Sequence, residues 1–368
     1  MSLIVGPDIA SLVPYTPGKP LEELEREYGI TDAVKLASNE NALGPSPRAQ
    51  AAIKNVVDTL NRYPDGGAHY LRRALAARWN VSSGQLIIGN GSDEIIGLLA
   101  KTFLDPGQEA VMADHTFVMY RLAVKACHGV PIEVPLKNWR YDLTAMVQAV
   151  TDRTRLLFLC NPNNPTGTIV SREEVEALLS SLPRQVVVVF DEAYYEYVRD
   201  THYPDSLQYV KQHRPVIVLR TFSKIYGLAG LRVGYGISTP EIINFLNRVR
   251  PPFNANSIAQ RAALAALEDT AHVEKSRAMN EEEMGTLEKG LQTLGCTPIP
   301  SQANFLYFDC GRDGAQVFEG LLREGVIVRH IKGSMVRVTV GKSNENQRFL
   351  QALARVLRQP FSSESAST

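Results

Sequence analysis

The sequence has few cysteines and no long apolar run. Its four cysteines, Cys127, Cys160, Cys296 and Cys310, form no C-x-x-C pair and have no histidine cluster nearby, which argues against a zinc site and a disulfide framework. No apolar stretch approaches the length that crosses a bilayer, and the first residues lack the basic start and apolar core of a signal peptide. We therefore expect no metal and no membrane association, and we predict a cytoplasmic protein.

A net charge is also absent. Lysine plus arginine and aspartate plus glutamate number 39 each, so no broad positive field favours nucleic acid as a partner. The composition is 44% hydrophobic and 21% charged, as in an ordinary globular protein. We therefore expect small molecules, and no nucleic acid, as ligands.

Apolar runs suited to buried strands alternate with amphipathic stretches between residues 92 and 250. This pattern is typical of an α/β sheet with helices on both faces, in which most strands run parallel. Strands are predicted at residues 109–113, 155–160, 186–190, 216–220 and 233–237. Helices are predicted to begin at Ser92 and at Ser171, where Ser171 and Glu174 have the spacing of a capping box.

The length of 368 residues suits one large domain with a smaller companion. We predict four segments: an N-terminal arm that includes part of the small domain (1–45), a large α/β domain (46–255), a small C-terminal α+β domain (256–360) and a disordered tail (361–368). The small domain is expected to contain long helices after residue 256 and short strands near residues 304–308, 326–329 and 336–340.

Reactive side chains follow the ends of two predicted strands. Lys224 comes four residues after the strand 216–220, and Asp191 directly follows the strand 186–190. Open α/β sheets bind ligands at the carboxyl ends of their strands. A lysine amine forms an imine with an aldehyde, and a carboxylate that faces a pyridine nitrogen keeps that nitrogen protonated. Pyridoxal 5'-phosphate (PLP) needs both groups, so the pair indicates a PLP site.

The segment GNGSDE is suited to hold the phosphate of such a cofactor. Gly89 and Gly91 allow a close approach of the backbone, and Ser92 and Asp93 begin a helix whose free N–H groups suit an anion. Arg232 begins another predicted strand and is a candidate charge partner for the phosphate. These residues predict a phosphate cradle beside Lys224.

Two more side chains follow strands at the same edge. Asn164, in NPNNPTG, is suited to donate to the phenolic oxygen of the cofactor, and Phe117, in DHTFVMY, is suited to cover the ring face. Each feature alone has an ordinary explanation as a surface lysine, an ion pair, a helix cap, a core phenylalanine or a proline-rich loop. Their joint occurrence at successive strand ends favours the cofactor site.

These segments together resemble a known family. GNGSDE, NPNNPTGT, DEAYYEY and TFSKIYGLAGLRVGY, with NENALGPSP before them and VRVTVG after them, closely resemble the histidinol-phosphate aminotransferase family of fold-type I PLP-dependent aminotransferases. The likeness runs from about Tyr15 to Arg358. It implies a large PLP-binding domain with a mostly parallel, seven-stranded sheet between helices, and a smaller α+β domain.

The resemblance implies roles for individual residues. Lys224 is expected to hold PLP as a Schiff base, Asp191 to bind the pyridine nitrogen, and Asn164 and Tyr194 to bind the phenolic oxygen. Tyr63, in RYPD, is similar to a tyrosine that reaches across a homodimer to the partner's cofactor phosphate. The remaining phosphate contacts are expected from Ser92, Asp93, Thr221, Ser223 and Arg232.

The resemblance also implies a substrate site. Arg337, in VRVTVG, resembles the arginine that binds a substrate carboxylate, and Arg329, in GVIVR, resembles a second anion-binding arginine. Tyr15 and Asn39 match positions of the arm that line the substrate pocket. We expect transamination of L-histidinol phosphate with 2-oxoglutarate, giving imidazole-acetol phosphate and L-glutamate in histidine biosynthesis.

Two other activities use the same cofactor residues. An aromatic amino-acid aminotransferase differs only in its amino donor, and a lyase similar to the threonine-phosphate decarboxylases releases carbon dioxide without an oxo-acid acceptor. The cofactor motifs do not separate these reactions, so both alternatives stay open at this point.

Overall fold

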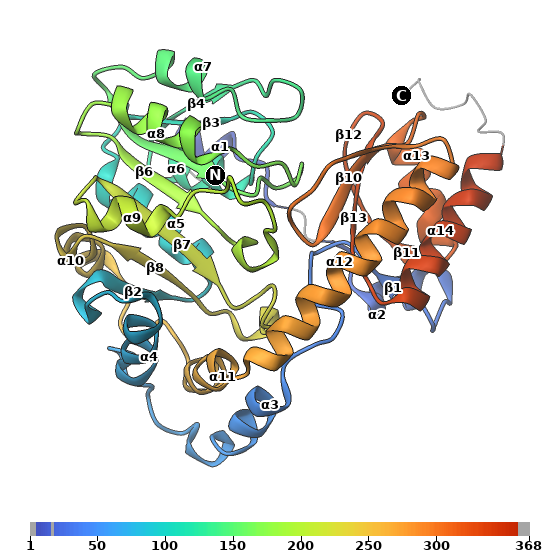
Figure 1. The fold of residues 1–368 in the computed structure, drawn as a ribbon, viewed down its shortest axis with the longest axis horizontal. Coiled ribbons are helices and arrows are strands. Elements are labelled where there is room, and N and C mark those ends of the chain that lie inside the picture. Colours follow the sequence, from blue (N-terminus) through green and yellow to red (C-terminus); the bar gives the residue numbers. More distant parts are fainter. Residues whose placement is uncertain (1–4, 16–17, 360–368) are drawn as a thin grey trace.

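The computed structural model describes residues 5–15 and 18–359, which form two lobes (Figure 1). The larger lobe contains a seven-stranded sheet and the smaller lobe a four-stranded one. The long helix α12 (Thr270–Thr293) extends from the lower edge of the larger lobe into the smaller lobe. The tail that we expect to be disordered, residues 361–368, lies outside the described residues.

The strands of the large sheet lie in the order β2 (Leu86–Gly89), β8 (Gly234–Ser238), β7 (Val216–Thr221), β6 (Val187–Asp191), β5 (Thr154–Cys160), β3 (Glu109–Ala113) and β4 (Val130–Val134). Neighbouring strands are parallel except that β8 is antiparallel to both β2 and β7. Between β7 and β8 the chain forms only the short 3-10 helix η4 (Ala229–Leu231) and no crossover α-helix. Without such a crossover, β8 returns beside β7 in the opposite direction.

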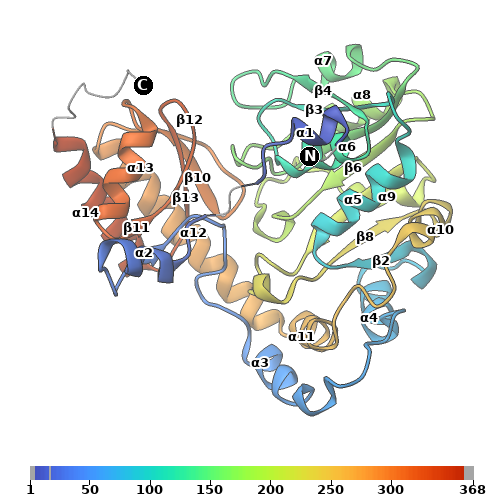
Figure 2. The ribbon, with the colours of Figure 1, turned by 180° about the vertical axis from the view of Figure 1, so that it is seen from behind.

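The five predicted strands are present, each within one residue of its expected bounds at either end. Every residue of β3, β6, β7 and β8 is buried, because helices cover both faces of the sheet (Figures 1 and 2). The sequence pattern did not indicate β2 or β4. β2 has only four residues, and β4 is a partly exposed edge strand that contains Pro131.

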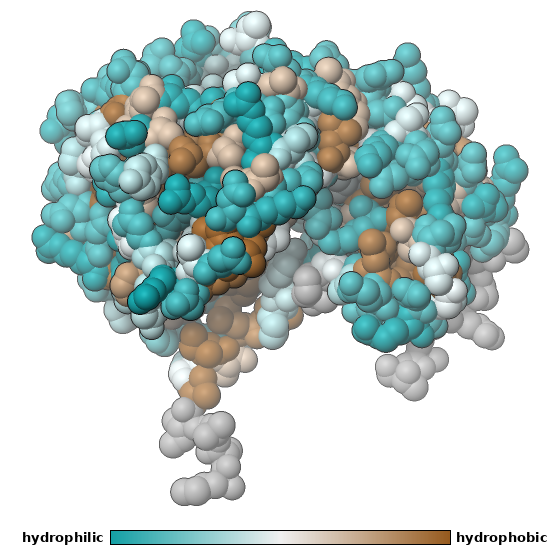
Figure 3. All heavy atoms as spheres, turned by 90° about the horizontal axis from the view of Figure 1, so that it is seen from below, coloured by the Kyte–Doolittle hydropathy of each residue, from teal (hydrophilic) through white to brown (hydrophobic). Residues whose placement is uncertain are grey.

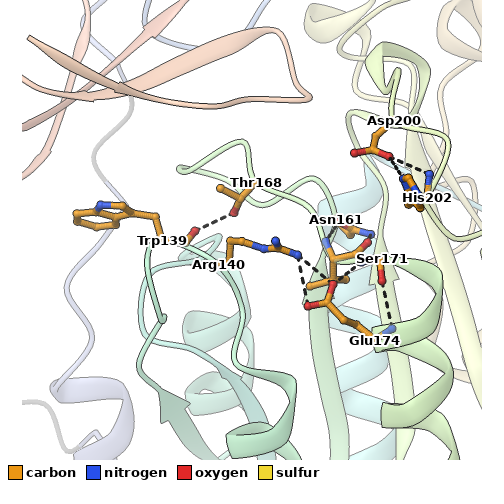
Figure 4. Close-up of polar contacts among 9 residues, drawn as sticks. Trp139, Arg140, Asn161, Thr168, Ser171, Glu174, Asp200 and His202 are labelled. Atoms are coloured by element: carbon orange, nitrogen blue, oxygen red, sulfur yellow. Dashed lines mark hydrogen bonds and ion pairs between the residues drawn. The ribbon is translucent and has the colours of Figure 1, made fainter.

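Both predicted helix starts are correct. α5 (Ser92–Phe103) begins at Ser92, and α8 (Arg172–Ser181) has Ser171 as its N-cap. Ser171 Oγ accepts a hydrogen bond from the Glu174 N–H at 3.3 Å, and Glu174 Oε2 accepts one from the Ser171 N–H at 2.6 Å. Figure 4 shows this capping box and the Arg140 guanidinium, which lies 3.0 Å from the same carboxylate. The helix start is thereby tied to the loop that precedes α7 (Leu143–Gln148).

The other helices of the larger lobe pack on the sheet or on one another. They are α3 (Pro47–Lys54), η1 (Val57–Thr59), α4 (His69–Trp79), η2 (Ser83–Gln85), α6 (Met119–Ala126), η3 (Tyr195–Tyr197), α9 (Ser206–Lys211), α10 (Pro240–Val249) and α11 (Ser257–Glu268). α1 (Pro7–Ala10) lies against α6, which is visible in Figure 2. Among the described residues, no helix has the length and the apolar composition that crossing a membrane requires.

The smaller lobe has an antiparallel sheet in the order β12 (Arg329–Lys332), β13 (Met335–Thr339), β10 (Phe305–Asp309) and β9 (Thr297–Ile299). It is covered by α13 (Gly314–Arg323) and α14 (Ser343–Arg358). The single strand expected at residues 326–329 is wrong. It is two strands, because β11 (Val326–Ile327) pairs with β1 (Val34–Lys35) whereas β12 pairs with β13.

The N-terminal segment joins the smaller lobe through β1 and α2 (Leu21–Tyr28). Leu24 of α2 is fully buried and packs in one cluster with Leu322 and Ile327. α11 packs against α3 and α4, on the side of the larger lobe. The exact domain boundaries after residues 45 and 255 stay predictions.

Candidate active site

A cavity of about 210 Å³ lies where β5, β6 and β7 end. Strand β13 of the smaller lobe contributes Arg337 to its wall. Most of the predicted site residues line it: Tyr15, Asn39, Ser92, Asp93, Phe117, Asn164, Asp191, Tyr194, Thr221, Ser223, Lys224, Arg232 and Arg337. A larger groove of about 920 Å³ lies at the opposite edge of the sheet, but none of these residues lines it. The predicted site residues therefore come together in the smaller cavity.

Lys224 follows β7 and extends into the cavity. Its Nζ donates a hydrogen bond to the backbone oxygen of Ser38 at 2.9 Å and lies 5.7 Å from the centroid of the Tyr194 ring. Burial lowers the pKa of Lys224 to about 7, and the nearby Arg337 guanidinium acts in the same direction. An amine that is partly neutral at neutral pH is suited to attack a carbonyl carbon or to accept a proton.

Asp191 is the last residue of β6 and is buried. Its Oδ2 accepts a hydrogen bond from the Tyr120 hydroxyl at 2.6 Å, whereas its Oδ1 is buried without a hydrogen-bond partner. Burial raises the pKa of this carboxyl to about 6. A buried acceptor without a donor is costly, and the N–H of a protonated pyridine ring is the donor that the predicted cofactor would bring. This orphaned oxygen fits PLP.

The residues of the expected phosphate cradle lie at the start of α5 and just before β8. Gly91 is the N-cap of α5 and has a φ of 81°, so Ser92 and Asp93 lie in the first helical turn. A Cβ at Gly91 would collide with the Arg232 guanidinium, which shows how closely that side chain covers the helix start. Arg232 Nη1 also donates to Ser223 Oγ at 3.4 Å. Helix N–H groups and a guanidinium together suit a phosphate.

Arg232 reaches this position because β8 is antiparallel. The start of β8 lies beside the end of β7, where Thr221 pairs with Gly234. Burial raises the pKa of the Asp93 carboxyl, and its Oδ1 is buried without a partner. Since a carboxylate repels an anion, the backbone N–H is the group of Asp93 that suits a phosphate.

The two lobes meet at the cavity through polar side chains. Asn39 Nδ2 donates to the Tyr194 hydroxyl at 3.0 Å, and Arg337 Nη2 donates to the Ala37 carbonyl at 2.7 Å. Arg337 Nη1 donates to Asn164 Oδ1, which leaves the amide nitrogen of Asn164 as its donor toward the cavity. Arg337 Nε is buried without a partner. The guanidinium therefore has an unused donor at a site expected to bind a carboxylate.

Three predicted residues do not line the cavity. Gly91 lies behind its wall, in contact range of Arg232. Arg329 lines an adjoining pocket of about 370 Å³ together with Tyr15 and Arg337, and its guanidinium carbon is 5.4 Å from the Tyr15 ring centroid. Tyr63 is 83% exposed and stacks on Phe253 with the ring centroids 4.7 Å apart.

The sequence did not single out several residues that the structure brings to the site. Ser38, Glu40, Cys160, Ala193 and Ala229 also line the cavity. Ser38 offers its backbone oxygen, which no sequence pattern marks. Tyr120, whose hydroxyl donates to Asp191, lies three residues after Phe117 in DHTFVMY, and that helical spacing is a signal from which it could have been found. Within the described ranges, no group of three or more acidic, histidine or cysteine side chains could hold a metal ion.

The chain is similar to known aminotransferases over almost its whole length. Residues 31–353 match the family model described as aminotransferase class I and II. Histidinol-phosphate aminotransferase of Moorella thermoacetica is 53% identical over 354 residues, 95% of this chain and 92% of the relative. The enzyme of the same name from an Anaeromyxobacter species is 49% identical over 360 residues, 96% of this chain and 99% of the relative.

A solved structure has the same architecture. The crystal structure of histidinol-phosphate aminotransferase from Sinorhizobium meliloti in complex with pyridoxal-5'-phosphate has a TM-score of 0.89 and 29% identity. The match covers 96% of this chain and 97% of the Sinorhizobium meliloti chain. The expected fold class, a mostly parallel seven-stranded sheet between helices with a smaller α+β domain, is confirmed.

Proposed function

The chain belongs to the histidinol-phosphate aminotransferases of aminotransferase class I and II, and from that premise we propose that it transfers the amino group of L-histidinol phosphate to 2-oxoglutarate. The products are imidazole-acetol phosphate and L-glutamate, in a step of histidine biosynthesis. One observation carries the proposal: Lys224, an Asp191 oxygen without a partner and an Arg337 donor without a partner lie in or beside one cavity.

The cavity residues suit PLP as the cofactor. Lys224 holds the aldehyde carbon, Asp191 Oδ1 accepts the hydrogen bond of the ring nitrogen, and Phe117 covers the ring. Asn164 and Tyr194 bind the phenolic oxygen. When bound, PLP supplies a ring that withdraws electrons from the substrate's α-carbon. The phosphate is held by Gly91, Ser92, Asp93, Thr221, Ser223 and Arg232.

Lys224 is the base of the proposed reaction. Its lowered pKa of about 7 leaves a large neutral fraction at neutral pH, so the amine can take the proton from the α-carbon of the amino donor. Asp191 keeps the ring nitrogen protonated because its buried Oδ1, which has no other partner, accepts the hydrogen bond of that nitrogen. Proton transfer and charge stabilisation thus come from two neighbouring strand ends.

Two arginines suit substrates that differ in their anionic groups. Arg337 binds the α-carboxylate of glutamate or 2-oxoglutarate through its unused donor. Arg329 and Tyr15, in the adjoining pocket, receive the phosphate of histidinol phosphate or the second carboxylate of the oxo acid. The cavity and this pocket share Tyr15, Phe117, Asn164 and Arg337, so one elongated substrate can occupy both.

The decisive experiment follows the absorbance of bound PLP with one amino donor at a time. We expect L-histidinol phosphate to convert the cofactor, and 2-oxoglutarate to restore it. Equal conversion by phenylalanine or tyrosine would instead identify an aromatic aminotransferase. Release of carbon dioxide from threonine phosphate without an oxo acid would identify a lyase. The Lys224→Ala variant is the control, because it lacks the proposed base.

We also propose a homodimer in which Tyr63 reaches the partner's cofactor phosphate. The ring of Tyr63 stacks on that of Phe253, and both rings are exposed. Val57 and Leu60 are each half exposed nearby in sequence, and Tyr70 is 56% exposed. These residues belong to the side of the larger lobe that carries α3, α4 and α11, which faces the viewer in Figure 3. Exposed apolar side chains of this kind favour an interface.

A complementation experiment tests the shared site. Lys224→Ala and Tyr63→Ala are each expected to have little activity alone. In a mixed dimer, one site then lacks both side chains and the other site has both, so co-expression restores activity. If Tyr63 acts within its own subunit, the mixed dimer has no intact site and stays inactive. Sedimentation of the native protein as a monomer at assay concentrations would also rule out the shared site.

A further inference from the structure

Tyr120 links two groups of the site although it does not line the cavity itself. It lies on α6 and is fully buried, and its hydroxyl donates to Asp191 Oδ2 at 2.6 Å. Its ring is stacked on that of Phe158, with the ring centroids 4.6 Å apart and an interplanar angle of 10°, and this packing restricts the direction of the hydroxyl. The same ring contacts Phe117 edge-on, with the ring centroids 5.6 Å apart and an interplanar angle of 84°. One buried side chain thus contacts both the carboxylate and the phenylalanine of the proposed cofactor site.

The surroundings of Asp191 make this hydrogen bond important. Asp93 on α5 and Glu192, which follows β6, are acidic neighbours that disfavour a negative charge on Asp191. Cys160 on β5 is buried directly beside Asp191 in the sheet register, and Lys224 after β7 lines the same cavity and interacts with the Asp191 charge. Among the described residues, Tyr120 is the side chain that donates a hydrogen bond to the Asp191 carboxylate, and the backbone of Ala193 also lowers the pKa of this carboxyl.

We propose that Tyr120 is a positioning residue, which holds one oxygen of the Asp191 carboxylate so that the other oxygen faces the ring nitrogen of the cofactor. This inference rests on the proposed function, since it concerns the same PLP site. The hydroxyl keeps its proton throughout, because burial raises the pKa of Tyr120 well above its usual value. A donor that does not ionise stabilises the charged form of its acceptor and lowers the acceptor's pKa.

The consequence is a defined pH dependence. In the native protein without cofactor, burial places the pKa of Asp191 at about 6 even with the hydrogen bond in place. Loss of a hydrogen bond to a charged group moves a pKa by about one to two units, here upward, because the ionised form loses its donor. Asp191 is then protonated at pH values where the native carboxylate is ionised. Without this hydrogen bond, the pH below which PLP is released should also rise by about one to two units.

Tyr120→Phe tests this because it removes the hydroxyl and keeps both ring contacts. Tyr203→Phe is the matched control, since Tyr203 is also buried and its hydroxyl donates to the Asn161 carbonyl instead of to Asp191. Full-length holoenzymes are diluted at a series of pH values, and released PLP is measured by its fluorescence. Lys224 and the cofactor phosphate are present in all variants, so the variants are compared with one another at the same pH. At pH 5 we expect Tyr120→Phe to retain PLP about ten- to a hundredfold less tightly than the control.

A double-mutant cycle separates positioning from a general structural role. In the Asp191→Asn background, Tyr120→Phe should change PLP retention by less than about twofold, because the charged acceptor is already gone. The inference is overturned if Tyr120→Phe follows the same pH curve as Tyr203→Phe, or if its effect persists unchanged in the Asp191→Asn background. Failure of the native protein to bind PLP at all would instead refute the proposed function, so the two failures are distinguishable.

Discussion

Gly91→Ala is the substitution whose outcome follows most directly from the geometry. Gly91 has a φ of 81°, and a Cβ there would collide with the guanidinium of Arg232. Two costs follow. Alanine is strained at this backbone conformation, and Arg232 must move away from the start of α5, where we propose that it binds the cofactor phosphate.

The two costs appear in different measurements. Backbone strain of this kind lowers the free energy of unfolding by about 1–3 kcal/mol. Displacement of the arginine removes a charge-assisted hydrogen bond from the phosphate, about 1.5–3 kcal/mol. At 1.4 kcal/mol for each factor of ten, PLP should bind roughly ten- to a hundredfold more weakly.

Gly107→Ala is the matched control. Gly107 has a φ of 83°, and a Cβ at this position has no heavy atom within 4 Å. It therefore shares the strain and lacks the collision. Urea unfolding should show destabilisation of both variants, whereas PLP titration should show weaker binding only for Gly91→Ala. Binding of pyridoxal, which has no phosphate, should be equal in both. Native PLP affinity in a folded Gly91→Ala variant would refute the cradle, as would equal losses of affinity for PLP and pyridoxal.

Three more predictions concern single side chains. Arg337→Ala should raise the KM for 2-oxoglutarate by roughly ten- to a hundredfold in steady-state assays, because a buried donor to the carboxylate is lost. In the cofactor-free protein, the rate at which PLP attaches should rise with pH and level off above about 7, since the lowered pKa of Lys224 makes its amine neutral there. A rise that continues toward the usual 10.5 in stopped-flow absorbance would contradict that burial effect. Glu192→Ala should lower the free energy of unfolding by about 3–5 kcal/mol in urea, because it leaves Arg220 buried without its partner at 2.7 Å. Glu281→Ala is the control, because Glu281 forms an exposed ion pair with Arg199. This substitution should change the free energy of unfolding by less than about 1 kcal/mol.

Local features of the sequence predicted much of the fold. The run VVVVF marked β6, since consecutive β-branched residues favour a strand buried on both faces. Ser171 and Glu174 marked the start of α8, since a capping box depends only on residues three apart. β11 and β12 were harder. Their separation depends on pairing with β1, a segment almost three hundred residues earlier in the chain, and local pattern carries no trace of that contact.

The same division applies to the site. Lys224 and Asp191 were found from sequence because each stands at or just after the end of a strand, and parallel strands bring such residues to one edge. The antiparallel direction of β8, which places Arg232 beside α5, was not apparent from the sequence. Nor was the hydrogen bond from Tyr120 that leaves a single oxygen of Asp191 without a partner.

The sequence by itself therefore determined which chemical groups this protein has and on which edge of the sheet they stand, because the positions and the ends of strands are marked by short local patterns. Only the tertiary structure decided their protonation and their partners. Burial holds the pKa of Lys224 near 7 and that of Asp191 near 6, and burial is a property of everything packed around a side chain. Contacts such as the one between Arg337 and Asn164 join residues far apart in the chain, and they exist only once both lobes have closed around the cavity.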